Sequence, residues 1–145
     1  KKDEKWYINT NESYAFADNQ VTRSWGTATP KAHADRNATD ENGVELNPVV
    51  VIEGLKTQLI RTLKQQVSNE LARTDWYITR NTEKSTAIPS AISTHRDAVR
   101  TKQAEMETAI SNASDTPALE TLYTYTEQDD GSVTRPLGEL PTLES

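Results

Sequence analysis

The sequence contains no cysteine, and this absence removes a whole class of chemistry. Disulfide bonds, thiolate nucleophiles and thiolate metal ligands are excluded, and the redox compartment stays undetermined. Histidine is scarce as well, since His33 and His95 lie far apart in the chain. A zinc site needs three or four nitrogen, sulfur or carboxylate ligands at suitable spacing. We therefore expect no metal.

Large apolar side chains are also few. Leu, Ile, Val and Phe make up 26 of the 145 residues, about 18%, just below the roughly 20% at which a chain begins to look disordered. The apolar run Val49–Ile52 is far shorter than the ~18–20 residues that cross a bilayer. No apolar stretch follows Lys1–Lys5, so no secretory signal is predicted and synthesis in the cytoplasm is expected.

The acidic balance of the chain is unevenly distributed. Its formal net charge is −6, yet residues 49–112 carry 9 basic and 7 acidic side chains, and residues 113–145 carry 1 and 7. A nucleic-acid-binding domain needs a pronounced basic patch, which this chain lacks. We expect neither a nucleic acid nor a membrane as partner. The acidic tail is interpreted as a solvated segment, with docking on a basic patch of a partner as the alternative.

No group of residues predicts catalysis. The acidic cluster in the linker-like segment 27–47 lacks the spacing of a calcium-binding loop (Asp35, Asp40, Glu41 and Glu45). The five glycines never gather into a phosphate-binding loop. We therefore expect that the protein is not an enzyme and uses no cofactor.

The stretch 49–112 predicts two amphipathic helices, because apolar residues recur every three or four positions. The first is expected to begin within Pro48–Ile52, and Gly54 either marks a later start or permits a close backbone approach. Its apolar face comprises Ile52, Leu55, Leu59, Leu63, Val67 and Leu71. Pro89 suits the first turn of the second helix, which ends near Asn112. The apolar face of this second helix comprises Ile92, Val99, Met106 and Ile110.

The spacing of seven between Ile92, Val99 and Met106 leaves two packing partners open: the first helix or a second copy of the chain. Between the helices, Thr74–Arg80 is predicted to be a loop, with Trp76 and Ile78 folded under the hairpin as a buried plug. We assign the integrity of the hairpin to Leu59, Leu63, Trp76, Ile78, Ile92 and Val99.

The N-terminal 48 residues predict a β-rich or extended arm. Lys5–Thr10 and Ser13–Asp18 are rich in aromatic and β-branched residues and are expected to pair as a hairpin. Tyr14 and Phe16 should share one face, since side chains alternate along a strand. Trp25 is either a packing anchor or an interface hot spot. The residues predicted to contact a partner are Trp6, Tyr14, Phe16 and Trp25.

The C-terminal segment 113–145 predicts a helical turn from Thr116–Pro117 and a β-hairpin around Asp130–Gly131. The fold class expected from these elements is mainly α: a helical hairpin at 49–112, with short β or extended arms at 1–48 and 113–145. An α+β fold is the alternative.

One part of the hairpin resembles a known family. The residues that show the resemblance are Leu71–Arg80, Glu83, Ala87–Pro89 and His95–Arg100. The chain has, in this order, a Thr-Asp-Trp segment, a helix that starts with proline and a His-Arg-x-x-Val-Arg run. This order resembles the helical C-terminal segment of bacteriophage tail assembly chaperones and tail-fibre assembly proteins. The resemblance covers about residues 55–112. The resemblance implies other phage tail or fibre proteins as partners and no catalytic residues.

The function expected is therefore that of a non-enzymatic bacteriophage tail protein, which binds tail or tail-fibre components during assembly in the host cytoplasm and then leaves or stays in the virion. The alternative is a permanent structural subunit, such as a baseplate, neck or fibre-adaptor protein, whose arms order on assembly. Self-association is left open.

Overall fold

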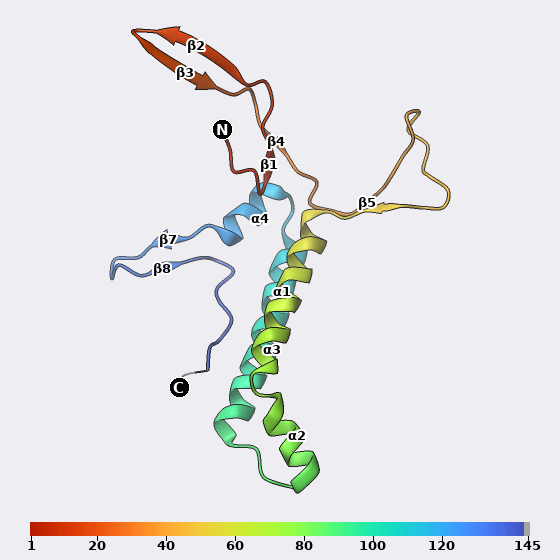
Figure 1. The fold of residues 1–145 in the computed structure, drawn as a ribbon, viewed down its shortest axis with the longest axis vertical. Helices are drawn as coiled ribbons and strands as arrows, with labels where there is room; N and C mark the ends of the chain where they lie inside the picture. Colours follow the sequence, from red (N-terminus) through yellow and green to blue (C-terminus); the bar gives the residue numbers. More distant parts are fainter. Residues whose placement is uncertain (144–145) are drawn as a thin grey trace.

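Two long helices form a stalk, and β-hairpins project from one end of it (Figure 1). The structure is a computed structural model that describes residues 1–143. The stalk consists of α1 (Leu55–Ala72) and α3 (Ser90–Asn112). They pack against each other because each presents the apolar face that the helical repeat predicts. Buried stalk residues are Leu55, Leu59, Leu63, Val67, Ile92, Val99, Met106 and Ile110.

Two shorter helices stand at opposite ends of the stalk (Figure 1). α2 (Asp75–Lys84) follows α1 at the far end from the hairpins. α4 (Thr116–Tyr123) follows α3, and its start is capped by Asp115, whose carboxylate accepts a 2.8 Å hydrogen bond from the backbone N–H of Ala118.

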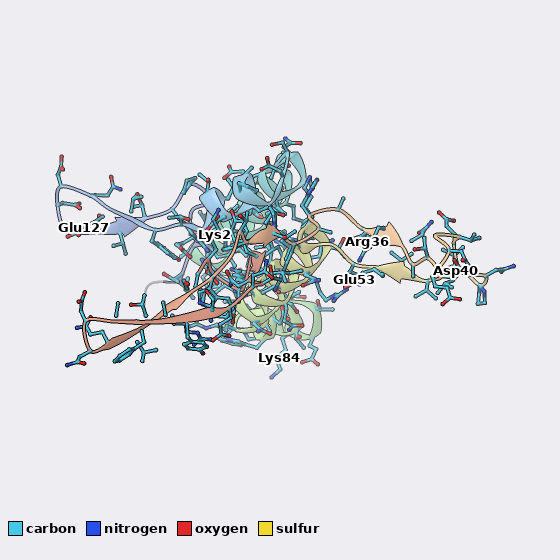
Figure 2. All side chains as sticks on the ribbon, turned by 90° about the horizontal axis from the view of Figure 1, so that it is seen from above. Lys2, Arg36, Asp40, Glu53, Lys84 and Glu127 are labelled. Atoms are coloured by element: carbon cyan, nitrogen blue, oxygen red, sulfur yellow. The ribbon has the colours of Figure 1, made fainter. Side chains whose placement is uncertain are left out.

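The strands in residues 1–143 form four separate two-stranded antiparallel sheets. β1 (Tyr7–Ile8) pairs with β4 (Thr29–Pro30), and β2 (Ser13–Ala17) pairs with β3 (Gln20–Ser24). β5 (Arg36–Asn37) pairs with β6 (Val51–Ile52), and β7 (Thr126–Glu127) pairs with β8 (Val133–Thr134). Three of these pairs lie on projecting arms, named here by their strands: the β2–β3 arm (13–24), the β5–β6 arm (36–52) and the β7–β8 arm (126–134). Seen from above, the labelled Asp40 and Glu127 lie at opposite extremes of the molecule (Figure 2).

The expected fold class, a mainly α hairpin, is wrong. Helices make up 41% of the chain and strands 17%, so the fold is mixed, with small sheets that share no strand. One cause is the β5–β6 arm, which builds a hairpin where a linker and the start of a helix were expected. Residues 36–52 show this, since Arg36 and Asn37 pair with Ile52 and Val51, and Thr39 forms a separate isolated bridge with Glu45.

The core lies where the stalk, α4 and both ends of the chain meet. Trp6 and Tyr7 from the N-terminal segment and Leu137 from the C-terminal segment are buried with Leu119 of α4. The rings of Trp6 and Tyr123 are 5.5 Å apart, a favourable tilted packing distance. The Tyr7 hydroxyl donates a 2.7 Å hydrogen bond to Oε2 of Glu120, which satisfies its polar end inside the contact.

The start of the first helix was predicted too early. α1 begins at Leu55, and Gly54 precedes it in an extended conformation. A Cβ atom at position 54 would lie 2.4 Å from the carbonyl carbon and oxygen of Ala34, so only glycine fits here. Asp35 stabilises the same junction, because its Oδ1 accepts 2.7 Å hydrogen bonds from the Gly54 N–H and the Thr57 hydroxyl. These hydrogen bonds lower the pKa of the Asp35 carboxyl.

Two further predictions of local structure are wrong. The segment Thr74–Arg80 is largely helical, because α2 starts at Asp75. The segment Ser13–Asp18 does form a strand, but it pairs with β3 instead of the preceding strand. The pair Asp18–Asn19 is the sequence signal for this turn and was overlooked. Asparagine and aspartate tolerate the positive φ that tight hairpin turns require.

Candidate partner-binding surfaces

The β2–β3 arm is a regular hairpin closed by a two-residue turn. Asp18 and Asn19 have φ angles of 51° and 56°, as a type I′ turn requires. The register places Phe16 opposite Val21 and Tyr14 opposite Arg23. Because directly paired residues and residues two apart share a face, these four side chains lie on one side of the hairpin.

This side of the β2–β3 arm is apolar and open to solvent. Phe16 is 72% exposed, Val21 67% and Tyr14 64%. The prediction that Tyr14 and Phe16 share a face is confirmed by the register. The opposite face carries only small or uncharged polar residues: Ser13, Ala15, Ala17, Gln20, Thr22 and Ser24. The arm is therefore amphipathic, with its apolar face uncovered.

At the base of the arm, two cationic side chains stack on the Trp25 ring and a carboxylate pairs with one of them. The guanidinium of Arg23 lies 4.7 Å from the centre of the Trp25 ring, and Lys1 Nζ lies 5.2 Å from it. Glu12 accepts hydrogen bonds from the Tyr14 hydroxyl and from Arg23, and these bonds lower the pKa of the Glu12 carboxyl. Trp25 is half-buried in this cluster, so it has contacts of the kind that a packing anchor makes.

Trp6 does not belong to this surface. Its side chain is 4% exposed, because it packs on Tyr123 in the core. The prediction that Trp6 contacts a partner is therefore wrong, because its side chain is not on the surface of the chain. Trp6 was assigned to the N-terminal arm, whereas it packs in the core and anchors that arm.

The β5–β6 arm presents a second apolar surface, which the sequence interpretation missed. Val44 is 61% exposed and Val49 is 59% exposed, and their apolar neighbours Leu46, Val50, Val51 and Ile52 are exposed too. Val49–Ile52 had been assigned to the start of a helix, although a run of β-branched residues after a proline is also a strand signal. In the turn, Asp40 Oδ1 accepts hydrogen bonds from the N–H groups of Asn42 and Val44. This carboxylate therefore shapes the turn, and residues 1–143 contain no cluster of three metal-ligating side chains.

The tip of the stalk differs from the predicted buried plug. Trp76 is 51% exposed and Ile78 is 38% exposed, so the plug prediction is wrong. The space beneath the tip is occupied by Arg96 instead. Its Nη1 donates 2.8 Å hydrogen bonds to the Leu71 carbonyl and the Thr74 hydroxyl and lies 2.9 Å from Asp75 Oδ1.

The outward side of α2 is consequently aromatic. The rings of Trp76 and Tyr77 are 3.8 Å apart, and the Arg80 guanidinium lies 4.7 Å from the Trp76 ring. Asp75, at the start of the same helix, pairs with Arg96. The tip thus offers a half-exposed tryptophan beside a stacked arginine, two residue types that are enriched at interface hot spots.

A cavity of about 250 Å³ lies between the stalk, the N-terminal segment and the C-terminal segment. Lys5 and Arg135 lie 4.4 Å and 5.1 Å from the ring of Tyr123 at its mouth. Burial, with a smaller contribution from the charge of Arg135, lowers the pKa of Lys5 despite the opposing effect of Asp3. Arg135 is already engaged by Glu139 and the Gly138 carbonyl. This cluster therefore holds the C-terminal segment on the core.

Comparison of the chain with protein-family models, with curated proteins and with solved structures finds no match. Among residues 1–143, none of the helices combines the length and apolar character that a membrane crossing requires.

Proposed function

We propose that the protein is a non-enzymatic bacteriophage tail protein that binds tail or tail-fibre components during assembly. The observation that carries the proposal is the position of the exposed large apolar side chains. Apart from Ile8 and Tyr125, they lie on the three arms and on α2: Tyr14, Phe16, Val21, Val44, Leu46, Val49, Val50, Val51, Ile52, Trp76, Ile78 and Val133.

Exposed apolar side chains gathered on projecting elements favour contact with another protein. Clustered exposed apolar surface marks interaction sites in soluble proteins. A two-stranded hairpin is at best marginally stable in water, and these arms receive little support from the core. A partner that covers the arms would bury their apolar faces and hold their strands in place.

The tail context is supported by the sequence pattern around Thr74, Asp75 and Trp76. In the structure, the first two residues of this pattern contact Arg96, and Trp76 points outward beside them. The pattern therefore ties the start of α2 to α3 and leaves one aromatic residue exposed beside this contact. Such an attachment is what a conformationally fixed contact site needs.

A second candidate function is that of a permanent structural subunit in the virion. It is favoured by the direction of the arms, since the β5–β6 arm points to one side of the molecule and the β2–β3 and β7–β8 arms point to the other (Figure 2). Arms that spread in this way suit a subunit that holds several neighbours at once. A transient chaperone would need to cover only one client surface.

The direct test is binding to purified tail and fibre proteins of the same phage, measured by biolayer interferometry. The variant F16S/V21S removes the apolar face of the β2–β3 arm, and its matched control Q20S/T22S changes the opposite face of the same hairpin. We expect the first variant to bind at least about tenfold more weakly, as loss of a large apolar contact does. The control should bind like the unmodified protein. Equal binding by both variants, or no binding by the unmodified protein, would contradict the proposal.

A further inference from the structure

The outer edge of β2 has none of the features that usually protect a strand edge. Natural edge strands carry charged residues, proline or bulges that prevent pairing with other chains. β2 has the sequence Ser-Tyr-Ala-Phe-Ala, without a charge or a proline, and all five residues are exposed. Its register with β3 is continuous from Ser13 to Ala17, so no bulge interrupts the strand.

The backbone groups at this edge point away from the hairpin. The pair that flanks a two-residue turn exchanges both backbone hydrogen bonds, and such pairs alternate along an antiparallel ladder. Here the flanking pair is Ala17–Gln20, so the backbone N–H and C=O groups of Ala15 and Ser13 also form their hydrogen bonds with β3. The N–H and C=O groups of Tyr14 and Phe16 therefore face outward and are available to another strand.

The sequence of β2 has the same kinds of side chain on either side of Ala15. Small residues stand at positions 13 and 17, and aromatic residues stand at positions 14 and 16. A twofold axis through an antiparallel pair places each residue opposite its mirror position in the second copy, so the aromatic residues would meet each other and the small residues would meet each other. We propose that β2 pairs with β2 of a second copy of this chain, with Ala15 opposite Ala15, to form a continuous four-stranded antiparallel sheet.

The proposed pairing satisfies both the backbone and the side chains. Tyr14 would exchange two backbone hydrogen bonds with Phe16 of the second copy, and Phe16 would do the same with its Tyr14. Aromatic residues directly opposite each other stabilise a sheet. The opposite face of the new pair carries only alanine and serine, so no bulky side chain obstructs the contact.

The charges nearest the edge do not lie in the new ladder. Glu12 is engaged by Arg23 and Tyr14 of its own chain. Asp18 belongs to the turn, where its φ of 51° takes it out of the strand conformation. The inference goes beyond the proposed function, because it concerns two copies of this chain and requires no tail protein.

The test uses the absence of cysteine from the chain. In the proposed sheet, the two Ala15 residues form the close, non-hydrogen-bonded type of pair, with Cα atoms about 4.5 Å apart. This separation permits a disulfide. The variant A15C should therefore form a disulfide-linked dimer under mild oxidation, seen by non-reducing electrophoresis and mass spectrometry as twice the 16.2 kDa of one chain.

The matched control is T22C, at the residue that pairs with Ala15 inside the hairpin. In the proposed sheet the two Thr22 residues lie on the outer strands, about 14 Å apart at three strand spacings. This variant should stay unlinked. Efficient linkage of T22C without linkage of A15C would overturn the proposal in favour of pairing through β3. Absence of linkage in both variants would overturn any pairing of the arms between copies.

A second measurement tests the same contact without a covalent bond. A15E places two like charges opposite each other across the twofold axis, which is destabilising in a sheet. Analytical ultracentrifugation should show a dimer for the unmodified chain, a dissociation constant up to about fivefold higher for A15E, and little change for T22E. A monomeric unmodified chain, or an equal effect of both variants, would overturn the proposal.

Discussion

The Arg96 guanidinium donates a 2.8 Å hydrogen bond to Oγ1 of Thr74, and this contact joins α3 to the junction of α1 and α2. Thr74 is 2% exposed and Arg96 is 8% exposed, so the bond lies inside the protein. The same nitrogen also reaches the carbonyl of Leu71 and the carboxylate of Asp75. A buried arginine with these partners fixes the direction in which α2 leaves the stalk.

Replacement of Arg96 with alanine should destabilise the protein strongly. The change removes the charged donor from the Leu71 carbonyl and the Thr74 hydroxyl, which keep a 3.1 Å hydrogen bond to each other, and each hydrogen bond from a charged group contributes about 1.5–3 kcal/mol. We expect a loss of about 2–4 kcal/mol in the free energy of unfolding, measured by urea titration. The matched control is R100A one turn further along α3, where an exposed pair with Asp97 should contribute less than about 1 kcal/mol. Equal losses in both variants would contradict the role of Arg96.

Replacement of Trp76 with alanine should affect binding far more than stability. If Trp76 were the buried plug predicted from the sequence, this change would cost about 3 kcal/mol. The half-exposed position reduces that expectation to less than about 1.5 kcal/mol of unfolding free energy. As reference, L119A removes a fully buried side chain and should cost about 2–5 kcal/mol. If thermal denaturation shows similar losses for both variants, Trp76 is part of the core after all.

The pH dependence of stability should include a contribution from Glu70. Burial acts to raise the pKa of this carboxyl, but hydrogen bonds from Arg73 and His95, together with their charges, outweigh it and lower the pKa. A carboxyl with a lowered pKa stabilises the folded state above its unfolded pKa of about 4.3. This stabilisation is lost as the pH falls through the folded value.

Urea titrations of the unmodified chain and E70Q between about pH 3 and pH 7 measure this contribution. The difference in unfolding free energy should shrink as the pH falls below about 4. The exposed carboxylate of Asp97, tested as D97N, provides the control. A difference between unmodified protein and E70Q that does not change with pH would show that Glu70 has no such role.

Replacement of Gly54 with alanine should loosen the base of the β5–β6 arm. The added Cβ would meet the backbone of Ala34 at 2.4 Å, so the chain must shift at this junction. We expect a loss of about 1–3 kcal/mol in unfolding free energy, as overpacking typically costs, and faster proteolysis within residues 36–52. S68A on the exposed side of α1 is the control and should leave both unchanged. Unaltered stability and proteolysis in G54A would mean that the close approach does not exist.

The helices of the stalk could be predicted from the sequence because their packing depends on a local repeat. The period of three to four residues in Leu55, Leu59, Leu63 and Val67 identifies the buried face without knowledge of its partner. The end of α3 near Asn112 and the helical turn that starts at Thr116–Pro117 follow from equally local signals. These elements agree with the structure for that reason.

The surfaces were harder to predict, because they depend on which of two residues, Trp76 or Arg96, is buried beneath α2. Trp76 is the more apolar residue, yet Arg96 occupies the space below α2, since three oxygen atoms there satisfy its guanidinium. No periodicity reveals such a network. The reverse error concerned Trp6, whose burial depends on Tyr123, more than one hundred residues away in the chain.

The most direct test of the proposed function is a count of this chain in purified phage particles and in infected-cell lysate by quantitative mass spectrometry. A fixed copy number relative to the major tail protein would establish a structural subunit. Absence from particles, together with a complex with a tail or fibre protein in the lysate, would establish an assembly chaperone. The proposal predicts one of these two results. A chain that is absent from the particles and bound to no tail or fibre protein in the lysate would contradict it.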